Sequence, residues 1–184
     1  MVTTTPPVFP PESQGKYQVR FDFGLAGLTR IGHADVVVWV DSLATGPGAQ
    51  ALDATLLPSE ASIIAAGLVN RSAAAQWVLD HQVRVGRRVS ISIVAAGRDG
   101  GFASNDLLAA GAVIDALVAR GIDFTSPEAA VACAAFEGLK NAVGHLFTAS
   151  VSGQERSAAG DAASVKAASA IDTRSDVDVL RLVE

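Results

Sequence analysis

Two aspartates stand where α/β proteins usually bind their ligands. Asp41 follows the β-branched run Val36-Val-Val-Trp-Val40, and Asp106 falls in the first turn of a predicted helix. Ligands of open α/β sheets lie outside the carboxyl ends of the strands, near helix N-termini. A carboxylate there can hold a hard cation or act on a proton. The alternatives are structural: Asp41 could order a turn, and Asp106 could complement the helix dipole.

The segment between these two features resembles an anion site. A strand ending near Val94 is followed by the glycine-rich loop Gly97-Arg-Asp-Gly-Gly101 and then by a helix start at Ser104. Free backbone amides and the helix dipole favour a phosphate in this geometry, and Arg98 adds positive charge. The pattern is neither a Walker loop nor a dinucleotide-binding glycine motif, so an ordinary surface loop is the alternative.

A third polar residue, Asn70, follows Ala66-Gly67 at another predicted strand-to-helix turn. Its side chain could contact a ligand. It could also simply cap the helix predicted over 71–83, which is the commoner use of asparagine at this position.

Strands alternate with helices along the chain, which predicts an α/β protein with a three-layer α/β/α arrangement and a mostly parallel or mixed central sheet. Residues 1–15 are expected to form a mobile arm before a single domain over 16–184. Apolar alternation places the strand at 17–23 on a sheet edge. The Ser152-Gly-Gln-Glu155 run predicts a capping box at the start of a short helix. The remaining predicted strands cover 34–40, 62–67, 88–95 and 176–183, and the longer helices cover 105–120 and 127–146.

Composition limits the class of protein. The 184 residues are 49% hydrophobic and 18% charged, which excludes disorder by composition, and the net charge of −5 comes without a basic run that would indicate nucleic-acid binding. The alanine-rich, aromatic-poor content predicts closely packed helices. No signal peptide and no apolar run long enough to span a membrane is evident, so we expect a cytoplasmic protein without a membrane partner.

Read in order, these segments resemble the 2-phosphosulfolactate phosphatase family. The resemblance rests on runs such as Ala34-Asp-Val-Val-Val-Trp-Val-Asp-Ser-Leu43, Asp106-Leu-Leu-Ala-Ala-Gly-Ala-Val-Ile114 and Ser152-Gly-Gln-Glu155. Further matching runs cover 17–24, 66–71, 94–97, 126–129 and 177–180.

The resemblance implies Mg²⁺-dependent hydrolysis of the phosphate ester of a small sulfonated hydroxy acid. Asp41 and Asp106 would hold the metal and carry catalysis. The expected substrate or phosphate contacts are Asn70, Gly97, Arg98, Ser104 and Glu155.

Two functions therefore stay open at this point. The first is a Mg²⁺-dependent phosphatase acting on a small phosphorylated acid. The second is a catalytically degenerate relative that binds an anionic metabolite or a protein partner. A homo-oligomer is a further expectation, with the 17–23 strand as the edge that another copy could cover.

Overall fold

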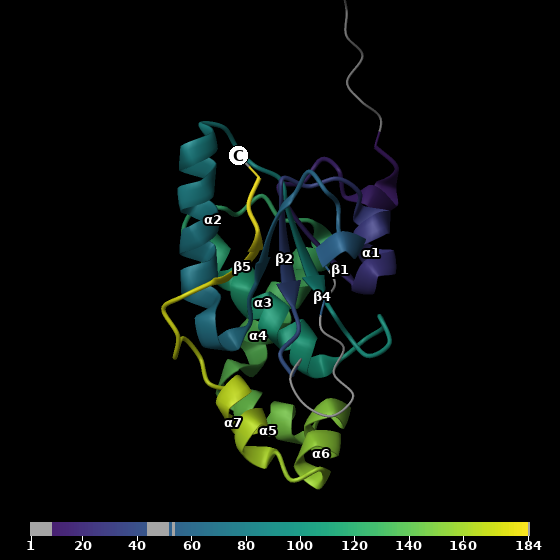
Figure 1. Cartoon of the computed structure of the whole chain (residues 1–184), viewed down its shortest axis with the longest axis vertical. Helices are drawn as coiled ribbons and strands as arrows, with labels where there is room; N and C mark the ends of the chain where they lie inside the picture. The colour runs from purple at the N-terminus through teal and green to yellow at the C-terminus, as the bar shows by residue number, and fades with distance from the viewer. Residues whose placement is uncertain (1–8, 44–51, 53, 184) are drawn as a thin grey trace, which may run out of the picture.

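A five-stranded mixed sheet forms the centre of the molecule (Figure 1). The computed structural model describes residues 9–43, 52 and 54–183. The strand order is β1-β4-β2-β3-β5; the first four strands are parallel and β5 runs antiparallel to β3. The strands are β1 (Val19–Phe23), β2 (Val36–Val40), β3 (Ser62–Ala65), β4 (Ile91–Ala95) and β5 (Asp178–Arg181).

The run of valines in β2 explains its central place between β4 and β3. Val36, Val38 and Val40 are fully buried against one helical layer, while Val37 is fully buried against the other. A strand covered on both faces carries apolar side chains without alternation, as predicted for this segment.

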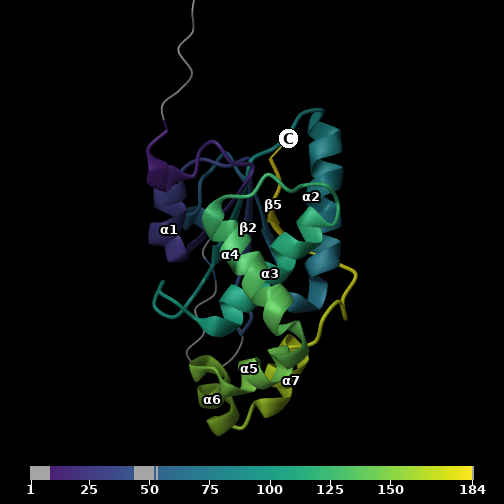
Figure 2. The same ribbon diagram turned by 180° about the vertical axis from the view of Figure 1, so that it is seen from behind.

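Helices cover both faces of the sheet, which confirms the three-layer fold. The helix α1 (Gly24–Ile31) packs on one face, where Leu28 and Ile31 contact Val37 and Ile63. The other face is covered by α2, α3 and α4, as Figure 2 shows. Their bounds are Arg71–Val85, Ser104–Val118 and Pro127–Leu139. None of the helices in the part of the chain that the structure describes combines the length and apolar character that crossing a bilayer requires.

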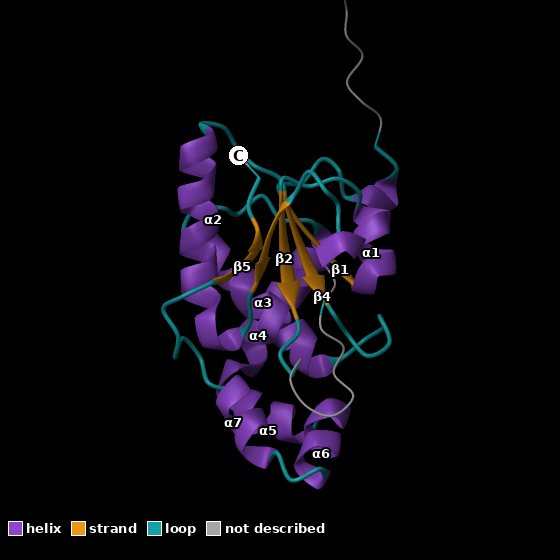
Figure 3. Ribbon diagram, in the orientation of Figure 1, coloured by secondary structure: helices purple, strands orange, loops and turns teal. Residues whose placement is uncertain are grey.

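Three short helices lie beyond the carboxyl ends of the parallel strands, whose arrowheads point toward them in Figure 3. They are α5 (Val143–Ala149), α6 (Val151–Ala158) and α7 (Ala162–Ala168). The prediction of a single helix over 127–146 was wrong. A 3₁₀ turn at Lys140–Ala142 separates α4 from α5; it contains Asn141 and follows Gly138, and both residues are weak helix formers.

The capping of α6 also differs from the prediction. Ser150, and not Ser152, is its N-cap: the Ser150 hydroxyl accepts a hydrogen bond from the Gly153 amide at 3.0 Å. The same hydroxyl donates to the Phe147 carbonyl at 2.7 Å and so joins the end of α5 to the start of α6. Both Ser150 and Ser152 fit the cap by type, but only Ser150 is in the extended conformation that a cap requires.

β1 lies at the sheet edge, as predicted, but much of its outer edge is paired within the chain. The Val19 amide donates to the Phe124 carbonyl at 3.0 Å, and the Val19 carbonyl accepts from the Ser126 amide at 2.8 Å. The Gln14 side chain bonds both the amide and the carbonyl of Phe21, each at 2.9 Å. These backbone groups are therefore not free to pair with a second copy, although the sequence predicted that another copy could cover this edge.

The residues just before β1 take part in this closure. Pro11–Ser13 form a 3₁₀ turn that places Gln14, only 6% exposed, against the strand. The arm predicted over 1–15 thus includes a packed stretch, and residues 1–8 lie outside the described part of the chain.

The contact between α3 and α4 is very close, as the alanine-rich composition predicted. A Cβ atom added to Gly111 in α3 would overlap the carbonyl oxygen of Ala132 in α4. Ala109, Ala112 and Ala129 are also fully buried in this layer. Glycine at 111 therefore sets the separation of the two helices and, through α3, the position of Asp106.

We expect Gly111→Ala to destabilise the fold, although alanine normally stabilises a helix relative to glycine by about 1 kcal/mol. Overpacking should cost about 1–3 kcal/mol in the free energy of unfolding, measured by urea denaturation. The matched control is Gly138→Ala in α4, where the added Cβ meets nothing within 4 Å and should stabilise. Equal effects of the two substitutions would contradict this account.

Candidate functional site

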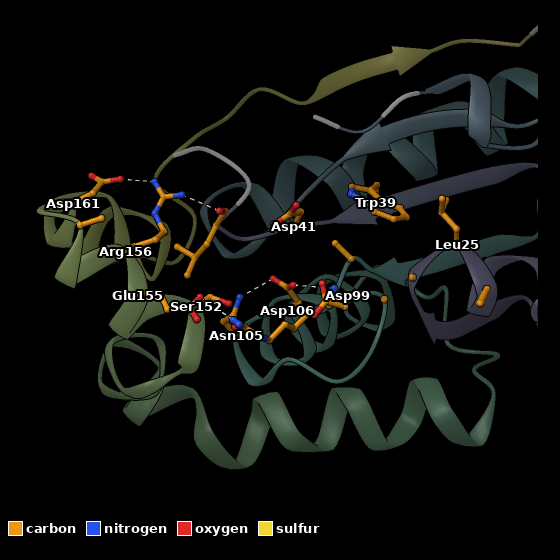
Figure 4. A pocket seen from close by; sticks show the side chains of 18 residues that line it. Leu25, Trp39, Asp41, Asp99, Asn105, Asp106, Ser152, Glu155, Arg156 and Asp161 are labelled. Carbon is orange, nitrogen blue, oxygen red and sulfur yellow. Dashed lines mark hydrogen bonds and ion pairs between the residues drawn. The ribbon is translucent and has the colours of Figure 1, made fainter. Parts of the chain in front are cut away.

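A cavity of about 750 Å³ opens at the carboxyl ends of β1, β2 and β4, a size suited to a small molecule. Residues from the start of α1, the loop after β4, the start of α3, and the α6–α7 region line it. Figure 4 shows Asp41 and Asp106 near its middle, between Arg156 on one side and Trp39 on the other. The cavity therefore lies where the strand pattern predicted a site.

Asp106 is 3% exposed and accepts three hydrogen bonds. Its Oδ1 accepts from the Ser42 amide at 2.9 Å and from the Asn105 Nδ2 at 2.8 Å, and its Oδ2 accepts from the Gly97 amide at 3.1 Å. Burial, reinforced by the charge of Asp41, raises the pKa of Asp106 to about 6, although the amide donors oppose the rise. Asp106 thus links the ends of β2 and β4 to the start of α3.

Asp41 lines the same cavity and interacts with Asp106 through charge. Burial raises the pKa of Asp41, while the Leu43 amide and the positive charge of Arg156 act in the opposite direction. Within the described residues, neither aspartate forms a salt bridge with a basic side chain. Two facing carboxylates of this kind repel each other unless a proton or a cation lies nearby.

These two carboxylates fit a magnesium ion that takes few protein ligands. Mg²⁺ commonly binds one or two carboxylates and completes its six positions with water and substrate oxygens. Asp106 Oδ2 carries one hydrogen bond and so keeps acceptor capacity for a cation. Over residues 9–43, 52 and 54–183, no cluster of three His, Cys, Asp or Glu side chains suited to a metal occurs.

The glycine-rich loop after β4 is a closed turn and not an open amide cradle. Arg98 and Gly101 exchange backbone hydrogen bonds of 3.2 and 2.8 Å, with Asp99 and Gly100 at positive φ between them. The Gly97 amide is held by Asp106. The amides of Gly97, Arg98 and Gly101 are therefore already bonded, and the half-exposed Arg98 side chain is the positively charged group that this turn offers a ligand.

The turn is held firmly against the start of α1. A Cβ atom on Gly24 would lie 2.6 Å from the Gly100 Cα, and one on Gly97 would overlap the Gly101 carbonyl oxygen. Both Gly24 and Gly97 also have positive φ. Glycine is required at these two positions for the backbone to close the cavity wall.

Both arginines in the cavity hold acids. Arg98 in the turn pairs with Glu155 of α6 at 2.8 Å, and each side chain of this pair is about half exposed. Arg156 pairs with Asp161 and donates to the Leu43 carbonyl at 2.9 Å, with its side chain only 10% exposed. Five carboxylates and two guanidiniums line the cavity in total: Asp41, Asp99, Asp106, Glu155, Asp161, Arg98 and Arg156.

The structure brings five of the seven predicted site residues to this cavity: Asp41, Gly97, Arg98, Asp106 and Glu155. Asn70 instead lines a smaller hollow of about 130 Å³ that shares Asp41. The Asn70 side chain accepts from the Gly67 amide at 3.0 Å and donates to the Asp176 carbonyl at 3.2 Å, so it organises the turn after β3.

Ser104 does not line the cavity. It is the first residue of α3, and Ala103 occupies the N-cap position. Sequence reasoning missed Arg156, Asn105 and Asp161 as residues of the cavity. Asn105 could have been found from the sequence, because it directly precedes the predicted site residue Asp106. Arg156 had no such signal, because its place depends on the packing of α6 beside Leu43.

The raised pKa of Asp106 gives stability a defined pH dependence. The folded protein keeps this proton up to about pH 6, whereas the unfolded chain loses it near pH 4, so the free energy of unfolding falls as pH rises through this window. Relative to Asp106→Asn, the wild type should lose about 2 kcal/mol between pH 4 and pH 7, measured by urea unfolding. Parallel pH curves for the two proteins would contradict the assignment.

Comparison with known proteins identifies the family of the chain. A family model described as 2-phosphosulpholactate phosphatase matches residues 12–182, which span all five strands and the cavity. No curated protein gives a match. Because the family model covers nearly the whole chain, this protein belongs to the 2-phosphosulpholactate phosphatase family.

Proposed function

We propose that this protein is a Mg²⁺-dependent phosphatase that hydrolyses a small phosphorylated hydroxy acid, such as 2-phosphosulfolactate. The observation that carries the proposal is the pair Asp41 and Asp106, which line one cavity at the strand ends, where the negative charge of Asp41 acts on Asp106. The family supports phosphate ester hydrolysis as the reaction.

The charge of the cavity supports a requirement for a cation. Its five carboxylates exceed its two guanidiniums, and both guanidiniums already hold acids. A phosphate monoester carries close to two negative charges at neutral pH, so the cavity as it stands would repel it. Mg²⁺ bound by the two aspartates would make the local electrostatic potential positive and so favour binding of the phosphoryl group.

The side chains have distinct roles in this proposal. Asp41 and Asp106 would hold the ion; Asp106 is already oriented by its three hydrogen bonds, so little reorganisation is needed on binding. When bound, Mg²⁺ polarises the phosphoryl group and the attacking water. Arg98 would contact the anionic substrate from the turn after β4, and Trp39 and Leu25 would shield part of the cavity from water.

The activity is tested by phosphate release from 2-phosphosulfolactate and a panel of small phosphomonoesters, with Mg²⁺ or with EDTA. We expect turnover only with Mg²⁺, and a loss of at least about 100-fold in kcat for Asp41→Asn, because a metal ligand is removed. Asp123→Asn, an exposed acid outside the cavity, is the control and should keep full activity. Equal rates in Asp41→Asn and wild type would disprove the role of Asp41.

Mg²⁺ binding should itself depend on pH. Below pH 6 the ion must displace the proton of Asp106, so its affinity should fall about tenfold per pH unit. We therefore expect Mg²⁺ at about 5 mM to raise Tm more at pH 7.5 than at pH 5, because tighter binding to the folded state stabilises it more. A shift in Tm that is equal or larger at pH 5 would argue against a metal at Asp106.

A second candidate is a non-catalytic relative that binds a small anion at the same cavity. It is favoured by the Arg98 guanidinium, which is about half exposed and can meet an anion without a metal. Stabilisation by phosphate in EDTA, together with no turnover on any ester, would favour this function over the phosphatase.

A further inference from the structure

Two ion pairs line the cavity, and they differ in how firmly they are held. The Arg156–Asp161 pair is the less exposed of the two, with side chains 10% and 33% exposed. Arg156 also donates to the Leu43 carbonyl, so it joins α6, the start of α7 and the end of β2. The Arg98–Glu155 pair joins two elements far apart in sequence, and its side chains are 47% and 57% exposed. Arg98 is therefore the guanidinium that a ligand can reach.

We propose that Glu155 competes with the anionic group of the ligand for Arg98, so that binding of a phosphoryl group in this cavity breaks the Arg98–Glu155 ion pair. The inference rests on the proposed function insofar as the ligand is a phosphorylated acid. It assigns to Glu155 a role opposite to that of a substrate contact: Glu155 lowers the affinity of the site.

The energetics favour such an exchange. Exposed ion pairs contribute little to stability, because solvent screens them and their side chains lose entropy when paired. A phosphoryl group carries more charge than one carboxylate and offers three oxygens to the guanidinium fork. The Glu155 pair can therefore be exchanged for a phosphoryl group at little cost, whereas release of Arg156 from Asp161 would disturb a guanidinium that is only 10% exposed and also bonded to the Leu43 carbonyl.

The geometry allows the exchange through side chains alone. The turn that carries Arg98 is fixed by its own backbone hydrogen bonds and by the contact with Gly24, so its backbone has little room to move. Glu155 lies on α6, which is capped by Ser150. Both side chains line the cavity and are about half exposed, so the proposed exchange would need rotation of side chains and no movement of the backbone.

A double-mutant cycle tests the proposal, with inorganic phosphate as the probe and isothermal titration as the measurement, at fixed Mg²⁺ and again in EDTA. We expect Glu155→Gln to tighten the Kd for phosphate by up to about fivefold, the range set by an exposed ion pair. Arg98→Ala should weaken it about tenfold or more. In the Arg98→Ala background, Glu155→Gln should no longer tighten binding.

Asp161→Asn is the matched control, because Asp161 is the acid of the other ion pair in the same cavity. It should lower Tm and give no comparable gain in phosphate affinity. An equal gain from Glu155→Gln with and without Arg98, or from Asp161→Asn, would mean that general charge repulsion acts and would overturn the proposal. An unchanged Kd in Glu155→Gln would overturn it as well.

The outcomes also separate this inference from the proposed function. Phosphate binding that follows the cycle above, in a protein that hydrolyses no ester, would support the competition and reject the phosphatase. Mg²⁺-dependent hydrolysis with a KM that neither Arg98→Ala nor Glu155→Gln changes would support the phosphatase and reject the competition.

Discussion

The carboxylate of Asp106 joins three parts of the molecule that the chain order keeps apart. It accepts hydrogen bonds from the amide after β2, from the amide after β4 and from the neighbouring Asn105 in α3. Two adjacent strands therefore end at a fixed separation, with the helix start between them. The same burial that strengthens these bonds raises the pKa of the group, because a carboxylate charge loses solvation when it is buried.

Close backbone approaches support this link. α3 can bring Asp106 to the strand ends because Gly111 lets α4 pack tightly behind it, and the loop after β4 can fold over the site because Gly24 and Gly97 carry no side chain. These glycines thus position charged side chains. They fix α3, which carries Asp106, and the turn after β4, which carries Arg98.

The α6–α7 region contributes one wall of the cavity and two of its five carboxylates. Glu155 and Asp161 come from this region, and each faces an arginine. The Arg156–Asp161 side chains are 10% and 33% exposed, whereas those of Arg98 and Glu155 are about half exposed. This difference in exposure is the reason why the proposed exchange of partners is placed at Arg98 and not at Arg156.

The sequence alone determined the layered fold and the strands that end at the site. Continuous valines placed β2 at the centre of the sheet, and its carboxyl end placed Asp41 at the ligand edge, because burial and alternation are local patterns. The resemblance to the family also followed from the sequence, and the match over residues 12–182 confirmed it. The edge position of the first strand was predicted for the same reason, but its pairing with Gln14 and Phe124 was not.

Only the tertiary structure decided which polar groups are free to act. Asn70 and the Gly97 amide fit a ligand site by type, yet their hydrogen bonds go to the protein itself. Arg156 enters the cavity through helix packing, which no local pattern encodes. Hydrogen-bond partners and burial depend on contacts between distant segments, so residue type and spacing can nominate a site residue, but only three-dimensional packing determines whether its polar atoms remain available.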